Sequence, residues 1–334
     1  MNSWTSIKLN EYKRRGLNCH FDYLITAISY EERGLESTKQ ILINFNISTV
    51  LLINFGTKYL SDELTEKWLS QKKELESFLN ENNIVHDIFE TELTNYQSLK
   101  QKFDLIDGKT IVNITTFPKN WILMLAKEFD GAHNLFFYLI DSWRIPTDDE
   151  LDIGLKDIVV VDGFEGETDL TTEILLVLIL GYEGHRTISF LSNFSSDIIL
   201  PIISVPSKGD KKEDELFYDN VYKCNWGLLN KNSVVRTSNN KIHTISSFSP
   251  VDFYHQLIEI VSQYKNVDVC ISPLGTKIQT LGLYLFCRDH PKTQVVYSIP
   301  IKRVNITEDL DKVKKKKSNI ENNCYIFKLP SEIN

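Results

Sequence analysis

One short polar turn, Ser272-Pro-Leu-Gly275-Thr276-Lys277, combines residue types that can hold an anionic ligand. Glycine leaves backbone N–H groups accessible, threonine supplies a hydroxyl and lysine an ammonium group, and a phosphate accepts from all three. The turn is not a Walker A loop, because no glycine opens such a motif and no Lys-Ser or Lys-Thr pair follows. The alternative is a simple tight turn with a solvated lysine. A lysine at a helix start opposes the helix dipole, which favours the ligand interpretation.

Two other turns share a Tyr-Glu pair that is followed within three residues by arginine. Arginine pairs bidentately with phosphate, glutamate accepts hydrogen bonds from ribose or base groups, and tyrosine stacks on bases. Each Glu-Arg pair is also consistent with a structural salt bridge at a helix start, but its occurrence in both halves of the chain favours a ligand. The turns supply Tyr30, Glu31 and Arg33 in the first half, and Tyr182, Glu183 and Arg186 in the second.

A fourth turn, Thr115-Thr116-Phe-Pro-Lys119, occupies the place in the first half that Gly275-Thr276-Lys277 occupies in the second. Each ends an apolar strand and follows its Tyr-Glu turn at a similar distance along the chain. We interpret this correspondence as an internal duplication with diverged copies, the alternative being a strand-helix rhythm that two α/β domains share by chance. Because the first copy lacks the glycine, we expect one asymmetric pocket that uses residues 182–186.

Apolar runs rich in β-branched residues alternate with amphipathic segments along the chain. Such runs are typical of parallel strands buried on both faces, and their alternation with helices indicates βαβ units. We therefore expect an α/β fold of two Rossmann-like, doubly wound units, residues 1–165 and 166–334. Strands are expected at 21–28, 48–55, 84–89, 110–116, 135–140, 157–162, 172–181, 197–205, 267–273 and 294–299, and helices at 35–45, 61–82, 96–106, 121–129, 187–194, 251–264 and 276–288.

Three segments carry more specific expectations. Pro201 lacks an N–H group, so the strand 197–205 is expected at an edge or to be irregular. The charged stretch 207–240 shows little apolar periodicity and is expected to be a long surface loop in the second unit. Residues 324–329 are expected to add an edge strand, after a solvated lysine run at 314–317.

Composition limits the class of protein. Hydrophobic residues make up 42% of the chain and charged residues 25%, which is typical of packed domains. The net charge of -8 makes direct nucleic-acid binding unlikely as a main activity. Five scattered cysteines without zinc spacing indicate reduced thiols in a cytoplasmic protein. No apolar run is long enough to span a membrane, and we expect no metal and no cofactor.

The sequence leaves catalysis open. No G-x-S-x-G elbow, kinase motif set or G-x-G-x-x-G fingerprint is present. A hydrolytic site needs a general base, and Glu31, Glu183 and Asp162 are candidates by position alone.

The Gly275-Thr276-Lys277 turn after a buried strand, together with the Ser-Tyr-Glu-Glu-Arg turn after the first strand, resembles CARF domains, the Rossmann-like sensors of CRISPR-associated effectors. Two such units in one chain resemble the related SAVED sensors of bacterial antiphage systems. The resemblance implies that a cyclic oligonucleotide binds at the carboxyl edge of the sheets. It also implies an effector protein partner or a homo-oligomer, because no nuclease, HEPN or membrane effector segment remains in this chain.

Three hypotheses follow. The first is a cytoplasmic nucleotide sensor of prokaryotic antiviral defence, the second a nucleotide or phosphodiester hydrolase, and the third an interaction scaffold of a multi-chain complex. In the first, the expected ligand-binding residues are Tyr30, Glu31, Arg33, Thr115, Thr116, Lys119, Tyr182, Glu183, Arg186, Ser272, Gly275, Thr276 and Lys277.

Overall fold

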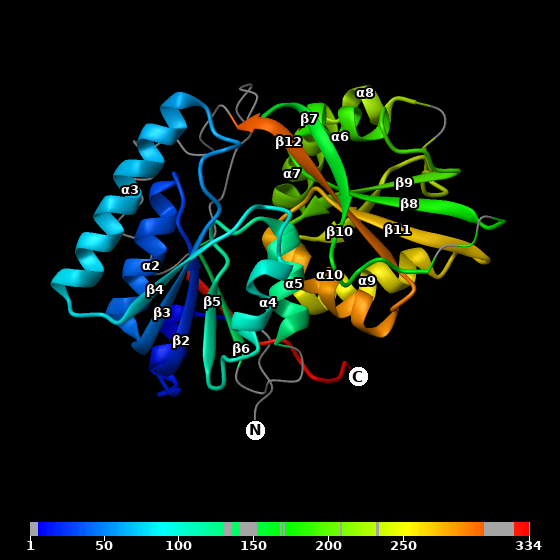
Figure 1. The fold of residues 1–334 in the computed structure, drawn as a ribbon. Coiled ribbons are helices and arrows are strands. Elements are labelled where there is room, and N and C mark those ends of the chain that lie inside the picture. The colour runs from blue at the N-terminus through cyan, green and yellow to red at the C-terminus, as the bar shows by residue number, and fades with distance from the viewer. Residues whose placement is uncertain are drawn as a thin grey trace. The chain divides into compact units, whose positions relative to one another are not determined.

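The computed structural model describes residues 6–129, 135–140, 152–167, 169, 171–207, 209–231, 234–303 and 324–333, and contains two sheets with helices between their strands (Figure 1). The chain divides into two compact units. The first comprises Met1–Trp121, Glu128–Ile145 and Arg303–Asn334, and the second Ile122–Lys127 and Pro146–Lys302. The expected α/β class with two Rossmann-like units is confirmed. The grouping of the chain end with the first unit differs from the expected division after residue 165.

The first unit is built on a sheet of seven strands. In space they follow the order β1-β13-β6-β5-β2-β3-β4, and β2 to β6 are parallel. This parallel part has the 3-2-1-4-5 order of a doubly wound, Rossmann-like sheet, and the order reverses between β2 and β5. The strands are β1 Ser6–Lys8, β2 His20–Ala27, β3 Asn46–Asn54, β4 His86–Glu90, β5 Thr110–Asn113, β6 Leu135–Ile140 and β13 Cys324–Phe327.

The second unit repeats this strand order. Its six strands follow the order β10-β9-β8-β11-β12-β7, so the order reverses between β8 and β11. The shared order is what an internal duplication would produce. The strands are β7 Asp152–Val160, β8 Glu173–Leu180, β9 Ile198–Val205, β10 His243–Ser246, β11 Val267–Pro273 and β12 Gln294–Arg303.

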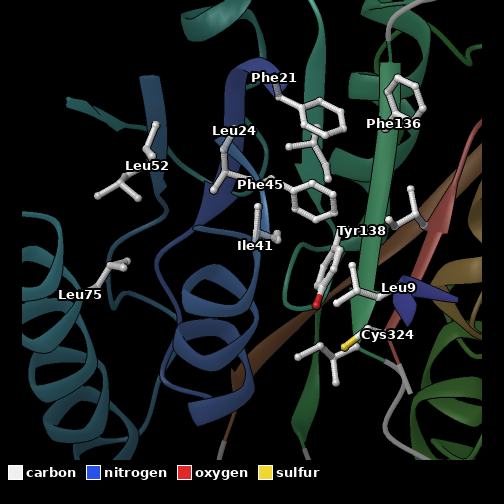
Figure 2. Packing of buried hydrophobic residues seen from close by; sticks show 14 of the residues in the cluster. Leu9, Phe21, Leu24, Ile41, Phe45, Leu52, Leu75, Phe136, Tyr138 and Cys324 are labelled. Atoms are coloured by element: carbon white, nitrogen blue, oxygen red, sulfur yellow. The ribbon is translucent and has the colours of Figure 1, made fainter. Parts of the chain in front are cut away.

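Helices cover both faces of the first sheet. In Figure 1, α2 and α3 lie on one side and α4 on the other, while most of α5 groups with the second unit. The α2 side is closed by a cluster in which Phe21, Leu24 and Phe136 of the sheet pack on Ile41 and Leu75 of the helices (Figure 2). The apolar stripe of α3 follows a serine N-cap, since Ser61 Oγ accepts from Leu64 N. The helices are α1 Leu9–Arg14, α2 Glu32–Asn44, α3 Asp62–Glu81, α4 Gln97–Phe103 and α5 Lys119–Glu128.

In the second unit, α6, α7 and α8 cover one face of the sheet and α9 and α10 the other (Figure 1). On the first of these faces, Leu178 and Ile203 of the sheet pack against Phe190, Val221 and Leu228. The helices are α6 Gly184–Leu191, α7 Lys211–Cys224, α8 Trp226–Leu229, α9 Pro250–Val261 and α10 Lys277–Asp289.

Three local expectations were wrong. β9 is an inner strand between β8 and β10, and it accommodates Pro201 because β10 pairs only from Ile202 onward. β13 lies between β1 and β6 instead of at an edge. The segment 207–240 contains α7 and α8, and α7 begins where Asp210 Oδ1 accepts from the backbone N–H groups of Lys212 and Glu213. The lysine run 314–317 lies outside the described residues.

The cysteines agree with a further expectation. All five cysteines are free thiols, and burial raises the pKa of Cys270 to about 12, which keeps it protonated and suits a packing role. Within the described ranges, no helix is both long and apolar enough to cross a membrane.

Candidate functional site

The expected site residues lie at the two places where strand order reverses. In open α/β sheets, ligands bind at the carboxyl ends of the strands at such a switch point. In the first unit, residues 29–33 follow β2 and Thr115 to Lys119 follow β5. In the second, residues 181–186 follow β8 and Gly275 to Lys277 follow β11. We call these two places the first and second edges.

The two turns of each edge are in contact. A Cβ atom built at Gly34 would lie 3.0 Å from Thr116 Cγ2, so the start of α2 touches the turn after β5. A Cβ atom built at Gly181 would lie 2.6 Å from the carbonyl oxygen of Leu274, which places the β8 turn against the β11 turn. The fold therefore brings together, within each unit, the two motifs that the sequence singled out.

At the first edge, Glu31 and Arg33 form an ion pair within one turn. Arg33 Nε donates to Glu31 Oε2 at 2.5 Å, and their side chains are only 14% and 9% exposed. Ser29 Oγ accepts from the backbone N–H of Glu31, and Tyr30 is buried. This geometry matches the salt-bridge alternative, and a ligand that uses either charged group would have to rearrange the pair.

The turn after β5 contains two buried polar atoms without a hydrogen-bond partner, Thr116 Oγ1 and Asn120 Oδ1. Asn120 Nδ2 donates to the carbonyl oxygen of Leu93 at 2.8 Å. This hydrogen bond fixes the orientation of the amide, so its oxygen points away from the Leu93 carbonyl. Neighbouring Thr115 differs, because its hydroxyl accepts from Ile140 N at 3.1 Å and so holds β6. Lys119 is the partly exposed first residue of α5. Buried unpaired polar atoms are rare and costly, so this turn has unused hydrogen-bonding capacity.

A buried amide lies beneath the first edge. Asn113 Nδ2 is 2.7 Å from Ser37 Oγ, and 3.1 and 3.2 Å from the hydroxyls of Thr26 and Thr38. Its Oδ1 accepts from the backbone N–H of Thr115. Asn113 therefore ties β2, β5 and α2 together. Its place in an apolar strand is the one sequence signal that could have identified it.

At the second edge, Arg186 is a buried residue that joins α6 to β12. Its Nε donates to Ser298 Oγ and its Nη1 to Glu183 Oε2, both at 2.7 Å, and its Nη2 donates to the carbonyl oxygen of Ser298. The guanidinium also lies 5.2 Å from the ring centre of Tyr297. In this conformation all three guanidinium nitrogens donate hydrogen bonds within the protein, which matches the salt-bridge alternative.

Tyr182 and Glu183 remain partly exposed at the same turn. The ring of Tyr182 lies 6.3 Å from that of Phe217 in α7, and burial raises the pKa of its phenol. The phenol is therefore a neutral group with an aromatic face at the edge of the sheet.

The turn after β11 is held by a capping box. Thr276 Oγ1 accepts from Gln279 N at 3.2 Å, and Gln279 Oε1 accepts from Thr276 N at 2.8 Å. The threonine hydroxyl is thus used in the helix cap, while Thr276 stays exposed and Lys277 partly exposed. A Cβ atom at Gly275 would lie 2.2 Å from Gln279 Oε1, so glycine is needed for close packing. Ser272 Oγ, at the end of β11, is buried without a partner.

Gln279 was not identified from the sequence, although it organises this edge. Its Oε1 also accepts from Ser204 Oγ of β9, and its Nε2 donates to the carbonyl oxygen of Ser246 in β10. One buried side chain therefore connects the ends of three strands. The Thr-x-x-Gln spacing is a capping-box signature and could have indicated the helix start, but it carries no information about β9 and β10.

The edges show no arrangement specific for a metal or for acid-base catalysis. Among the described residues, no group of three or more His, Cys, Asp or Glu side chains could hold a metal ion. Glu31 and Glu183 each pair with an arginine, and Asp162 follows β7, away from both turns in sequence. The geometry suits binding and positioning better than proton transfer.

No protein-family model and no curated protein matches the chain. Among solved structures, it is similar to one described as a type III CRISPR defence DNA nuclease activated by cyclic oligoadenylate. The sequences are 9% identical, the match covers 84% of this chain, and the TM-score is 0.48. The chain spans 66% of the length of that nuclease. The fold assignment itself rests on the strand order of the two sheets.

Proposed function

We propose that the protein is a sensor that binds a nucleotide-type, phosphate-containing ligand at one or both edges. The observation that carries the proposal is that both sheets have a Rossmann switch point, and that the turns there hold the Tyr-Glu pairs and the Thr and Lys residues. Unpaired hydroxyls at Thr116 and Ser272 lie at equivalent strand ends and support it.

The proposed ligand class is a cyclic oligonucleotide, and the proposed setting is prokaryotic antiviral defence in the cytoplasm. Both rest on the resemblance of the Gly275-Thr276-Lys277 turn to CARF and SAVED sensors. Lys277 and Lys119 would contact phosphates, and Tyr182 would stack on a base. The ion pairs of Arg33 and Arg186 would have to open before either arginine could bind the ligand.

The test is isothermal titration calorimetry of the purified chain against a panel of cyclic di- and trinucleotides. We expect micromolar or tighter binding by at least one member. Lys277→Ala should weaken it if the second edge binds, and Lys119→Ala if the first edge does. The stoichiometry then distinguishes one asymmetric pocket from two. A folded protein that binds no member of the panel would overturn the proposal.

A second candidate function is protein interaction, in which this chain passes a signal to an effector protein. It is favoured by large apolar side chains exposed on α6, α7 and α8: Ile188 is 42% exposed, Leu216 58% and Trp226 54%. Co-purification of an effector chain with the wild type, and its loss with Trp226→Ser, would support this function. A monomer that retains no partner from its native host would contradict it.

A further inference from the structure

The junction between α7 and α8 is fastened to the β8 turn by one buried amide, that of Asn225. Asn225 is fully buried. Its Nδ2 donates to the carbonyl oxygen of Gly181 at 2.8 Å and to that of Val221 at 2.9 Å, and its Oδ1 accepts from Thr187 Oγ1 at 2.9 Å. The side chain therefore joins the end of β8, helix α6 and helix α7, and its hydrogen-bonding capacity is almost filled.

Two further contacts hold the same turn from the same side. A Cβ atom at Gly184 would lie only 1.6 Å from the carbonyl oxygen of Cys224, so the last turn of α7 rests on the backbone where α6 begins. The ring of Phe217 packs near the ring of Tyr182. Gly181, Tyr182 and Gly184 are thus each held by α7 or by the residue that follows it.

We infer that Asn225 is a positioning residue, through which the α7–α8 junction holds the Tyr182–Glu183 turn in the conformation that binds ligand. The ligand part of this inference rests on the proposed function. A turn that is already ordered loses less conformational entropy when ligand binds. Undocking of the α7–α8 junction would leave the turn less ordered and so would weaken ligand binding. By linkage, a bound ligand stabilises the docked junction to the same extent.

The first test needs no ligand and measures amide hydrogen exchange in the full-length chain. Asn225→Ala should increase the amide exchange rates of residues 182–188 by roughly tenfold. The reason is that loss of the Asn225 hydrogen bonds raises the equilibrium constant for local opening by about that factor. Asn230→Ala is the matched control, since Asn230 is exposed on the same segment, and it should leave exchange unchanged. Equal exchange in Asn225→Ala and wild type would overturn the inference, whether or not any nucleotide binds.

The second test uses a milder pair of variants, in case Asn225→Ala does not fold. Thr187→Val removes the hydroxyl that donates to Asn225, and Thr187→Ser retains it. With cyclic triadenylate as the probe, we expect about a fivefold weaker affinity for Thr187→Val and near wild-type affinity for Thr187→Ser. A purely packing role would reverse this order, because valine preserves the shape of threonine and serine does not. No binding to wild type would count against the proposed function, whereas equal binding by all three proteins would overturn only the positioning role.

Discussion

The two edges have the same strand order but are organised differently. At the first, a buried amide in the sheet, Asn113, bonds hydroxyls of β2 and α2, and the turn after β5 keeps two polar atoms unpaired. At the second, Gln279 and Asn225 tie the turns to neighbouring strands and to the inserted helices. The second edge also keeps one buried hydroxyl without a partner, that of Ser272. The edges therefore differ mainly in how their turns are tied to the rest of the unit: by one amide within the sheet at the first, and by two side chains that reach distant segments at the second.

The largest expected effect compares two glycines in the first turns of equivalent helices, Gly184, the first residue of α6, and Gly34, the third residue of α2. Gly184→Ala places a methyl group 1.6 Å from a backbone oxygen, so we expect a loss of about 4 kcal/mol, or undocking of α7. Gly34→Ala meets side-chain atoms at 3.0 to 3.1 Å, and the better helix propensity of alanine offsets part of that cost. Its stability should change by less than about 1 kcal/mol. Urea denaturation of both variants measures the contrast, which equal losses would contradict.

Arg186 tests whether the second edge uses its arginine for structure or for ligand. Arg186→Ala removes the buried guanidinium and its hydrogen bonds to Glu183 and Ser298, and we expect a loss of about 3 kcal/mol of unfolding free energy. Arg186→Lys keeps the charge but cannot reproduce the three donors, so it should restore only part of the stability. If Arg186→Lys were fully stable and only lost affinity for the nucleotide, Arg186 would be a ligand group.

Thr115 and Thr116 are adjacent at the first edge, and replacing each by valine is expected to change the stability of the protein in opposite directions. Thr115→Val removes a hydroxyl that accepts from Ile140 N and should destabilise the protein by about 1 kcal/mol. Thr116→Val removes a buried hydroxyl that has no partner, so we expect a gain of up to about 1 kcal/mol. Thermal unfolding of the two variants measures both. A comparable loss in Thr116→Val would show that its hydroxyl is satisfied, and that the two threonines do not differ in their hydrogen bonding.

The smallest expected effect is the contribution of Tyr182 to the loss of stability at alkaline pH. Burial raises the pKa of its phenol, so the folded protein retains this proton above pH 10, where the unfolded chain releases it. Stability should therefore fall as pH rises above about 10, by at most about 1.4 kcal/mol per pH unit for this one group. Tyr182→Phe removes this titrating phenol, so the unfolding free energy should fall slightly less steeply with pH. Denaturant unfolding at several values between pH 9 and pH 11 measures the slope. An unchanged slope would mean that the phenol is solvated, and that Phe217 does not hold it.

Much of the fold follows from local sequence. Apolar runs such as 48–55 and 172–181 define buried strands because a parallel strand covered on both faces needs apolar side chains at every position. The starts of α9 and α10 are defined by Ser249 and Thr276, whose side chains cap the first turn. The four turns of the candidate edges were identified for the same reason, since polar residues that directly follow such a strand can only lie at its carboxyl end.

Local sequence did not determine how those turns are held. The charged run 207–240 contains few apolar residues, and α7 forms because Asp210 caps it and Val221 is buried against the sheet. Pro201 fits an inner strand only because β10 starts one residue later. The roles of Asn225 and Gln279 depend on carbonyl and hydroxyl groups 33 to 75 residues away.

The sequence by itself therefore determined most of the strands, the starts of helices such as α9 and α10, and the position of the polar turns, which depend on side chains a few residues apart. Tertiary structure alone decided which turns meet. It also decided that Arg186 donates to Ser298, and that the Thr115 hydroxyl has a hydrogen-bond partner while the Thr116 hydroxyl has none. The physical reason is that a hydrogen bond between distant segments depends on the order in which strands pair. That order follows from packing of the whole sheet and not from any single segment.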